Sequence, residues 1–290
     1  MELEFQKANL NLLNHIKKHF DNNKPFLIGR LACLEPIVVY SVMMNSMNNN
    51  LMYKLSNNAG IFCVSKESLV KWSKEYYNSM KNSTNLGIWE KEGGVYKWTG
   101  PSQEFFIKAI KPSQVFYAPA LSAFDYVPSW TTALHGKKIL IISPFTDSIE
   151  SQVKSGNLAR IFKHQENWFQ DCSFIYVKTP QTQAGNHGGI DWEVRFHKLC
   201  RNVDSAITED FDCALLSCGG YGMPLANYIF KKGKSAIYVG GVLQILFGVM
   251  GGRWEVERNI DEKINREFWT RPTDAEKPPN FKLVEGGCYW

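Results

Sequence analysis

The pattern of hydrophobic and polar positions changes character near residue 136. Before that point apolar residues recur at the spacing of amphipathic helices, with lysines and asparagines on the opposite side. One short apolar run has instead the length of a buried strand. The pattern predicts helices over residues 3–20, 36–47, 65–80 and 101–111, a strand over 26–29, a loop with a short helix over 48–60, irregular chain over 83–100 and an aromatic crossing segment over 113–130.

From Gly136 onward, continuous apolar runs alternate with helical patterns. Such runs are typical of parallel strands that are buried on both faces. The alternation predicts an α/β fold: a Rossmann-like, mostly parallel, doubly wound sheet with helices on both faces. We expect one domain over residues 1–290, made of a helical N-terminal portion with the first strand (1–135), a βα core (136–254) and a C-terminal tail over the cleft (255–290). The core strands are predicted at 138–143, 173–177, 212–216 and 236–239, with helices over 143–162, over 191–207 and after two glycine-rich joints.

These two joints follow neighbouring strands. Gly219-Gly220-Tyr221-Gly222 comes after the run 212–216, and Gly240-Gly241 comes after the run 236–239. In open α/β sheets ligands bind at the carboxyl ends of strands, where glycine allows close approach and a helix start offers N–H groups to an anion. The joints therefore favour a nucleotide or phosphate cleft. Tight turns that need glycine for their backbone conformation alone are the plainer interpretation.

Two arginines are candidate phosphate ligands. Arg30 and Glu35 flank the exit of the first strand, where Glu35 could hold a divalent cation or accept a proton; an ion pair at the start of a helix is the alternative. Arg253 could clamp a diphosphate bidentately while Trp254 stacks on a base or sugar. For Arg253, a surface arginine beyond a helix end is the alternative.

The composition narrows the class of protein. The hydrophobic share of 44% and the charged share of 21% are those of a soluble globular protein, and the net charge of +5 includes no basic run that would predict nucleic-acid binding. Seven scattered cysteines form no CxxC pair, which predicts reduced thiols in a cytoplasmic protein. We expect no transmembrane segment, and an oligomer is compatible with the sequence.

Several motifs together resemble one family. The segment Arg30-Leu31-Ala32-Cys33-Leu34-Glu35 is similar to the R-x-G-D-G-E or R-x-G-x-x-E segment of the GT-D fold glycosyltransferases, formerly a domain of unknown function. The stretches 139–145, 210–222, 239–248, 252–254 and 285–290 resemble the same family. The resemblance implies an enzyme that transfers a sugar from a nucleotide sugar, here expected to be a UDP-sugar, to a glycan or glycoprotein.

The resemblance also implies roles for particular residues. In the family a D-x-E pair near the first strand is tied to a metal and to the donor diphosphate; Glu35 matches the second acid, and Cys33 replaces the first. A neutral thiol is a poor ligand for Mg²⁺ or Mn²⁺, so we expect arginines and helix N-termini to neutralise most of the diphosphate charge. The candidate bases are Glu35, Asp147 and Glu285. The residues expected to bind the nucleotide sugar are Arg30, Ser143, Ser217, Gly219, Gly220, Tyr221, Gly222, Gly240, Gly241, Gln244, Arg253 and Trp254.

Two other functions stay open on the sequence. The incomplete acid pair is compatible with a nucleotide-binding module that has no catalytic activity. A dinucleotide-dependent oxidoreductase is a further alternative, against which the absence of a ribose-binding acid argues.

Overall fold

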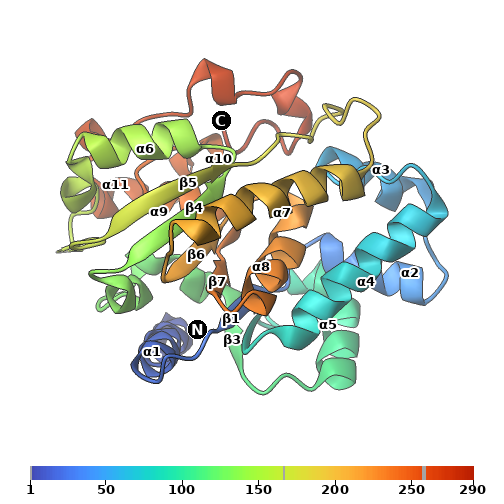
Figure 1. Ribbon diagram of the computed structural model, residues 1–290, viewed down its shortest axis with the longest axis horizontal. Coiled ribbons are helices and arrows are strands. Elements are labelled where there is room, and N and C mark those ends of the chain that lie inside the picture. The colour runs from blue at the N-terminus through green and yellow to red at the C-terminus, as the bar shows by residue number, and fades with distance from the viewer. Residues whose placement is uncertain (1, 166, 257–258) are drawn as a thin grey trace.

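The computed structural model describes residues 2–165, 167–256 and 259–290 (Figure 1). Seven strands form one sheet in the order β3-β2-β1-β7-β6-β4-β5, and every pair of neighbours is parallel. The predicted α/β class with a parallel, doubly wound sheet is therefore confirmed. The strands are β1 (Leu27–Arg30), β2 (Asn85–Ile88), β3 (Val115–Tyr117), β4 (Lys138–Ser143), β5 (Ser173–Lys178), β6 (Cys213–Leu216) and β7 (Ser235–Tyr238).

Helices cover both faces of this sheet (Figure 1). They are α1 (Glu2–Asp21), α2 (Glu35–Met43), α3 (Asn49–Asn57), α4 (Lys66–Asn82), α5 (Tyr96–Ile110), α6 (Thr146–Lys154), α7 (Trp192–Thr208), α8 (Gly222–Lys231), α9 (Leu243–Leu246), α10 (Gly252–Glu255) and α11 (Ile260–Lys263). None of the helices in the described part of the chain combines the length and the apolar character that crossing a bilayer requires.

Two hydrophobic cores lie on opposite faces because side chains alternate along each strand. In β4, Ile139 and Ile141 pack into the core shared with α1, α6, α9 and the C-terminal tail. Leu140 and Ile142 pack into the core shared with α2, α4, α5, α7 and α8. All four side chains are fully buried, which explains why this strand appears in the sequence as a continuous apolar run.

The N-terminal portion contributes more to the sheet than the sequence pattern predicted. Besides β1 it contains β2 and β3, which lie in the stretches expected to be irregular or to cross between the halves. Both strands are short, and β2 contains Gly87, so neither has a recognisable apolar run. The helix expected over 143–162 also ends early, at Lys154, because Gly156 takes a left-handed conformation with φ of 72°.

Connections leave neighbouring strands toward opposite faces. After β4 and β7 the chain enters α6 and α9 on one face, whereas after β1 and β6 it enters α2 and α8 on the other. In the sheet order β1-β7-β6-β4, the chain that leaves each strand thus goes to the opposite face of the sheet from the chain that leaves the neighbouring strand. Such divergence opens a crevice outside the carboxyl ends of the strands, where ligands bind in open α/β sheets.

The C-terminal tail is fastened across this edge by the fully buried carboxylate of Glu276. Helix α6 begins after Phe145, whose side chain cannot cap it. Glu276 Oε1 accepts hydrogen bonds from the backbone N–H groups of Asp147 (3.0 Å) and Ser148 (3.1 Å), the second and third residues of the helix. Glu276 Oε2 accepts from the N–H of Thr273 (3.0 Å) and from the Ser148 hydroxyl. A carboxylate from the tail therefore performs the capping that a local Ser, Thr or Asp usually performs.

We predict that Glu276→Gln lowers the free energy of unfolding by about 2–4 kcal/mol, because the amide removes the charge and points N–H groups at N–H donors. Equilibrium urea unfolding measures this loss. The matched control is Glu267→Gln on the exposed part of the tail, for which a change within about 0.5 kcal/mol is expected. Equal losses in the two variants would contradict a capping role for Glu276.

Candidate functional site

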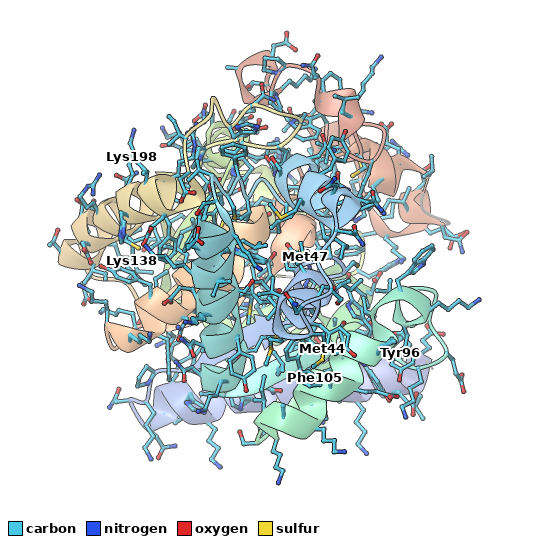
Figure 2. The ribbon with its side chains drawn as sticks, turned by 90° about the vertical axis from the view of Figure 1, so that its right-hand side faces the viewer. Met44, Met47, Tyr96, Phe105, Lys138 and Lys198 are labelled. Carbon is cyan, nitrogen blue, oxygen red and sulfur yellow. The ribbon has the colours of Figure 1, made fainter. Side chains whose placement is uncertain are left out.

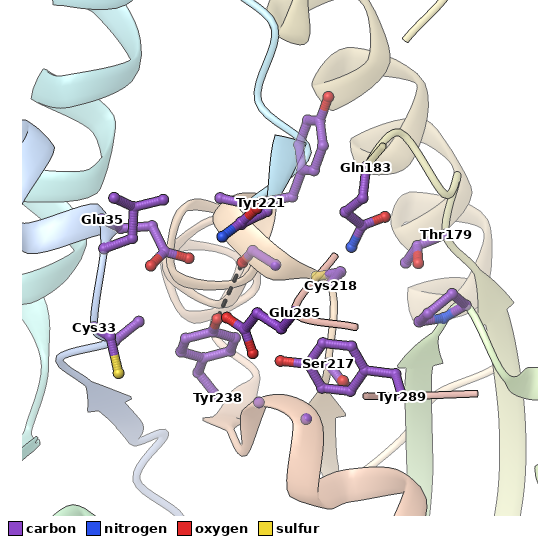
Figure 3. A pocket seen from close by; sticks show the side chains of 18 of the residues that line it. Cys33, Glu35, Thr179, Gln183, Ser217, Cys218, Tyr221, Tyr238, Glu285 and Tyr289 are labelled. Atoms are coloured by element: carbon purple, nitrogen blue, oxygen red, sulfur yellow. Dashed lines mark hydrogen bonds between the residues drawn. The ribbon is translucent and has the colours of Figure 1, made fainter. Parts of the chain in front are cut away.

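A cavity of about 200 Å³ lies outside the carboxyl ends of six strands, β2, β1, β7, β6, β4 and β5. Its walls come from the residues that follow these strands, from the end of α3 and from the C-terminal tail; Figure 3 shows most of them. The lining residues are Arg30, Ala32, Cys33, Leu34, Glu35, Asn58, Ala59, Trp89, Pro144, Phe145, Thr179, Pro180, Thr182, Gln183, Ser217, Cys218, Gly219, Tyr221, Tyr238, Gly240, Gly241, Arg253, Glu285, Tyr289 and Trp290.

Arg30, the last residue of β1, is held in an aromatic cage. Its guanidinium carbon lies 5.8 Å from the ring centroid of Trp89 and 5.6 Å from that of Tyr238. Gly240 lies against the same group, and a Cβ at this position would overlap the guanidinium. Gly240 also has a φ of 73°, so its backbone favours glycine as well.

The charge of Arg30 has no acidic partner in the described part of the chain, where no carboxylate oxygen lies within the 4.0 Å of an ion pair. The Nε of Arg30 is buried and has no hydrogen-bond partner. The ion pair with Glu35 considered above is thus not formed. Removing a cation from water without a partner is costly, so the cage is suited to an anionic ligand.

Glu35 begins helix α2, and only 6% of its surface is exposed. Burial raises the pKa of its carboxyl, although the N–H groups at the start of the helix and the charge of Arg30 act in the opposite direction. Figure 3 shows the carboxyl directed into the cavity, toward the side from which Glu285 enters.

The tail brings a second cation and a second acid to the cavity. Arg253 Nη2 forms an ion pair with Glu285, and it also lies 3.3 Å from the Cys288 thiol. The Arg253 guanidinium carbon lies 4.9 Å from the ring centroid of Tyr289, which in turn covers Gly241. Burial raises the pKa of the Tyr289 hydroxyl to about 12, so this group is a hydrogen-bond donor at neutral pH. Arg253 therefore lines the cavity, although 44% of its side chain stays exposed to solvent.

The residues predicted from the sequence fall into two groups. Nine line the cavity: Arg30, Glu35, Ser217, Gly219, Tyr221, Gly240, Gly241, Arg253 and Glu285. Six do not line it: Ser143, Asp147, Gly220, Gly222, Gln244 and Trp254.

Packing explains most of the glycine joint at 219–222. A Cβ on Gly219 would lie 2.6 Å from the carbonyl oxygen of Ala59, and one on Gly220 or Gly222 would overlap Ile61 or Tyr238. The N–H of Gly220 donates to the Ala59 carbonyl (2.9 Å) and is not available to a ligand. These glycines allow close packing; of the three, only Gly219 has the positive φ of the plainer interpretation, and only Gly219 lines the cavity.

Contacts within the protein occupy the other residues that do not line the cavity. Asp147 pairs with Lys178, and Ser143 accepts a hydrogen bond from the N–H of Phe145 at 3.1 Å. Gln244 donates to the carbonyl oxygen of Tyr289 at 3.0 Å and so helps to fix the tail. The start of α6, one of the helix N-termini at a strand end, is occupied by the Glu276 carboxylate. The ring of Trp254 is buried against Tyr289, with centroids 6.1 Å apart.

Trp89 and Gln183 line the cavity although no sequence motif singled them out. Trp89 follows the unpredicted strand β2, and its backbone is clamped by the buried amide of Gln103 through hydrogen bonds of 2.7 and 2.8 Å. Gln183 belongs to the loop after β5. That loop follows a correctly predicted strand, so its position at a strand end was the signal that could have identified it.

The acids at the site do not fit a divalent metal ion. Among the residues that the structure describes, no three His, Cys, Asp or Glu side chains form a group that could hold one. Glu35 is accompanied by the thiol of Cys33 and not by a second carboxylate of the same segment. Mg²⁺ and Mn²⁺ prefer several oxygen ligands, and the only carboxylates that the described lining supplies are those of Glu35 and Glu285, the second of which is paired with Arg253.

A second hollow, of about 380 Å³, lies between α2, α3 and α4 on the side of the molecule that Figure 2 presents, where Met44 and Met47 are labelled. Its lining is mostly apolar, and its one charged member is Lys66. No strand end contributes to it. The hollow lacks the paired acids and arginines of the first cavity, which is therefore the candidate site.

Comparison with known proteins gives one match. No protein-family model and no curated protein matches the sequence. A solved structure described as a new glycosyltransferase (DUF1792) from Streptococcus sanguinis aligns with 91% of this chain and 94% of its own, at 14% sequence identity and a TM-score of 0.49. At this identity and score the similarity by itself assigns neither a family nor an activity.

We predict that Gly240→Ala weakens the binding of inorganic pyrophosphate about tenfold or more, because the new Cβ displaces the Arg30 guanidinium. Isothermal titration calorimetry measures the affinity. Gly233→Ala is a matched control: Gly233 also has a positive φ, of 80°, but no atom lies within 4 Å of its Cβ position. Each variant should lose about 1–2 kcal/mol of stability through backbone strain, and only Gly240→Ala should lose affinity. Unchanged binding in Gly240→Ala would contradict the role of the Arg30 cage.

Proposed function

We propose that the protein is a glycosyltransferase. It transfers a sugar from a nucleotide sugar, which we propose is a UDP-sugar, to a hydroxyl of a glycan or glycoprotein. The observation that carries the proposal is the unpaired, caged Arg30, which lines the same cavity at the strand ends as the buried carboxyl of Glu35. The sequence resemblance to GT-D glycosyltransferases, which is strongest over residues 136–254 and looser in the first half, where Arg30 and Glu35 lie, supports the same reaction.

In the proposed reaction the arginines stabilise the leaving group. Breaking the bond between the sugar and the nucleoside diphosphate leaves additional negative charge on the diphosphate. Arg30 is half-buried and is flanked by Trp89 and Tyr238, so it needs little reorganisation to receive that charge. Arg253 can add a second contact if the diphosphate replaces Glu285 as its partner.

Replacing Glu285 as the partner of Arg253 would release the Glu285 carboxylate. That carboxylate and Glu35 are the two acids that line the cavity, and either can accept the proton of the acceptor hydroxyl if the reaction inverts configuration. Asp147 is no longer a candidate base, because it lies outside the cavity and is paired with Lys178.

We expect the wild-type protein to bind UDP and to release UDP slowly from a UDP-sugar, because water can replace the acceptor. Arg30→Gln should weaken UDP binding about tenfold to a hundredfold, since a charge-assisted contact is lost. Calorimetry and a UDP-release assay measure the two effects, with Arg201→Gln on the exposed side of α7 as the matched control. Binding of UDP without release from any UDP-sugar would favour the non-catalytic module, and binding of a nicotinamide dinucleotide in place of UDP would favour the oxidoreductase.

The donor set leads us to expect activity without a divalent cation. UDP release by the wild-type protein should keep at least about half of its rate in excess EDTA, because arginines and not a metal balance the diphosphate charge. The same assay, run with and without added Mn²⁺, measures the effect. Complete loss of activity in EDTA, restored by Mn²⁺, would contradict this expectation.

A further inference from the structure

The cavity has a charged half and a neutral half that follow the order of the strands. The charged side chains of the lining are Arg30 and Glu35, which come from the end of β1 and the start of α2, and Arg253 and Glu285, which come from α10 and the tail. Tyr289 of the same tail lies against Gly241, just after β7. On the β6, β4 and β5 side, none of the described lining residues carries a charged side chain. The polar groups there are amides and hydroxyls: Asn58, Thr179, Thr182, Gln183, Ser217 and Tyr221.

Among the described residues of the neutral half, Gln183 is the one that has a buried side-chain polar atom without a hydrogen-bond partner. Its Oε1 is buried and accepts no hydrogen bond from the described residues. Figure 3 shows the side chain directed from its loop into the cavity, opposite the side that holds Glu35. A buried amide oxygen without a hydrogen-bond donor costs free energy, which a ligand hydroxyl could recover by donating to it.

The loop that carries Gln183 is held at both flanks. The Thr182 hydroxyl donates to the carbonyl oxygen of Gly60 at 2.7 Å, and the N–H of Ala184 donates to the carbonyl oxygen of Asn57 at 3.0 Å. The Gln183 amide therefore lies on a loop that is hydrogen-bonded on both sides to the segment at the end of α3, and these hydrogen bonds fix its position.

Aromatic rings close the other walls of the neutral half. Phe145 and Trp290 meet edge to face, with centroids 6.1 Å apart, and Tyr221 is buried at the start of α8. Arg195 lies near Tyr221, but its Nη2 donates to the carbonyl oxygen of His187 at 2.6 Å, and it does not line the cavity. No cation of the lining is thus available here to pair with a carboxylate.

We infer that the neutral half is a binding site for an uncharged hexose, and that the Gln183 amide forms a hydrogen bond with one of the hydroxyls of that sugar. This inference rests on the proposed function, which places the diphosphate in the charged half. Amide groups and aromatic rings suit a sugar, whose hydroxyls donate and accept hydrogen bonds and whose C–H faces are apolar. A sugar acid would bring a carboxylate into a half that offers it no countercharge.

The sugar belongs either to the donor or to the acceptor, and calorimetry on two variants distinguishes these sources. Gln183→Leu removes the amide at nearly constant size, and Gln170→Leu makes the same change on an exposed turn as the control. If the site holds the donor sugar, Gln183→Leu weakens UDP-glucose about fivefold to thirtyfold and leaves UDP unchanged. If it holds the acceptor sugar, the same loss appears for methyl β-glucoside added to the UDP-saturated protein, and UDP-glucose is unchanged.

Three results would overturn the inference: no change for either sugar ligand, an equal loss for UDP itself, or binding of the corresponding glucuronate as tight as that of the glucoside or UDP-glucose. Circular dichroism checks that Gln183→Leu is folded, and Gln183→Asn, which keeps an amide, should retain part of the affinity. Failure of the wild-type protein to bind UDP would contradict the proposed function instead. In that case the methyl β-glucoside titration, run without UDP, still tests the hexose site.

Discussion

One buried carboxylate decides where the end of the chain lies. Helix α6 starts without a side-chain cap of its own, and Glu276 supplies the missing hydrogen-bond acceptors from far along the sequence. Because these N–H groups are at the carboxyl edge of the sheet, satisfying them draws the tail over that edge. The tail then contributes Glu285, Tyr289 and Trp290 to the cavity wall. This capping interaction, together with hydrogen bonds such as that from Gln244 to the carbonyl oxygen of Tyr289, links the stability of the fold to the completeness of the site.

The parallel sheet determines how the chemistry is distributed. Every strand ends at the same edge, so residues that follow β1 and β5 line one cavity although three strands separate them. The exits diverge between neighbouring strands, and the resulting crevice extends across several of them. This extension leaves room for a charged half beside β1 and β7 and for a neutral half beside β6, β4 and β5. The proposed substrate, with an anionic and an uncharged part, matches that division.

The sequence predicted those features that have a local cause. Strands covered on both faces appear as apolar runs, so β4 and β6 were found, whereas β2, with Asn85 at its start and Gly87 within it, was not. Once these strands were located, the residues that follow them were good candidates for the cavity, because ligands bind at the carboxyl ends of strands in open α/β sheets. Features that arise from distant contacts could not be predicted: the capping of α6 by Glu276, and the packing of Gly220 against Ile61. The glycine pattern was recognised, but its cause is steric and depends on a segment far away in the sequence.

Gly240 and Arg30 are remote in sequence but lie in contact, and a side chain at position 240 would occupy the space that the Arg30 guanidinium fills. A side chain at position 240 is compatible with the fold only if the residue at position 30 is shorter, and a shorter residue would no longer carry its charge into the cavity. Substitutions at the two sites are therefore epistatic. Among homologous sequences, the glycine and the arginine should be inherited together or lost together, so that their co-variation would distinguish proteins that retain this anion site from those that keep only the fold.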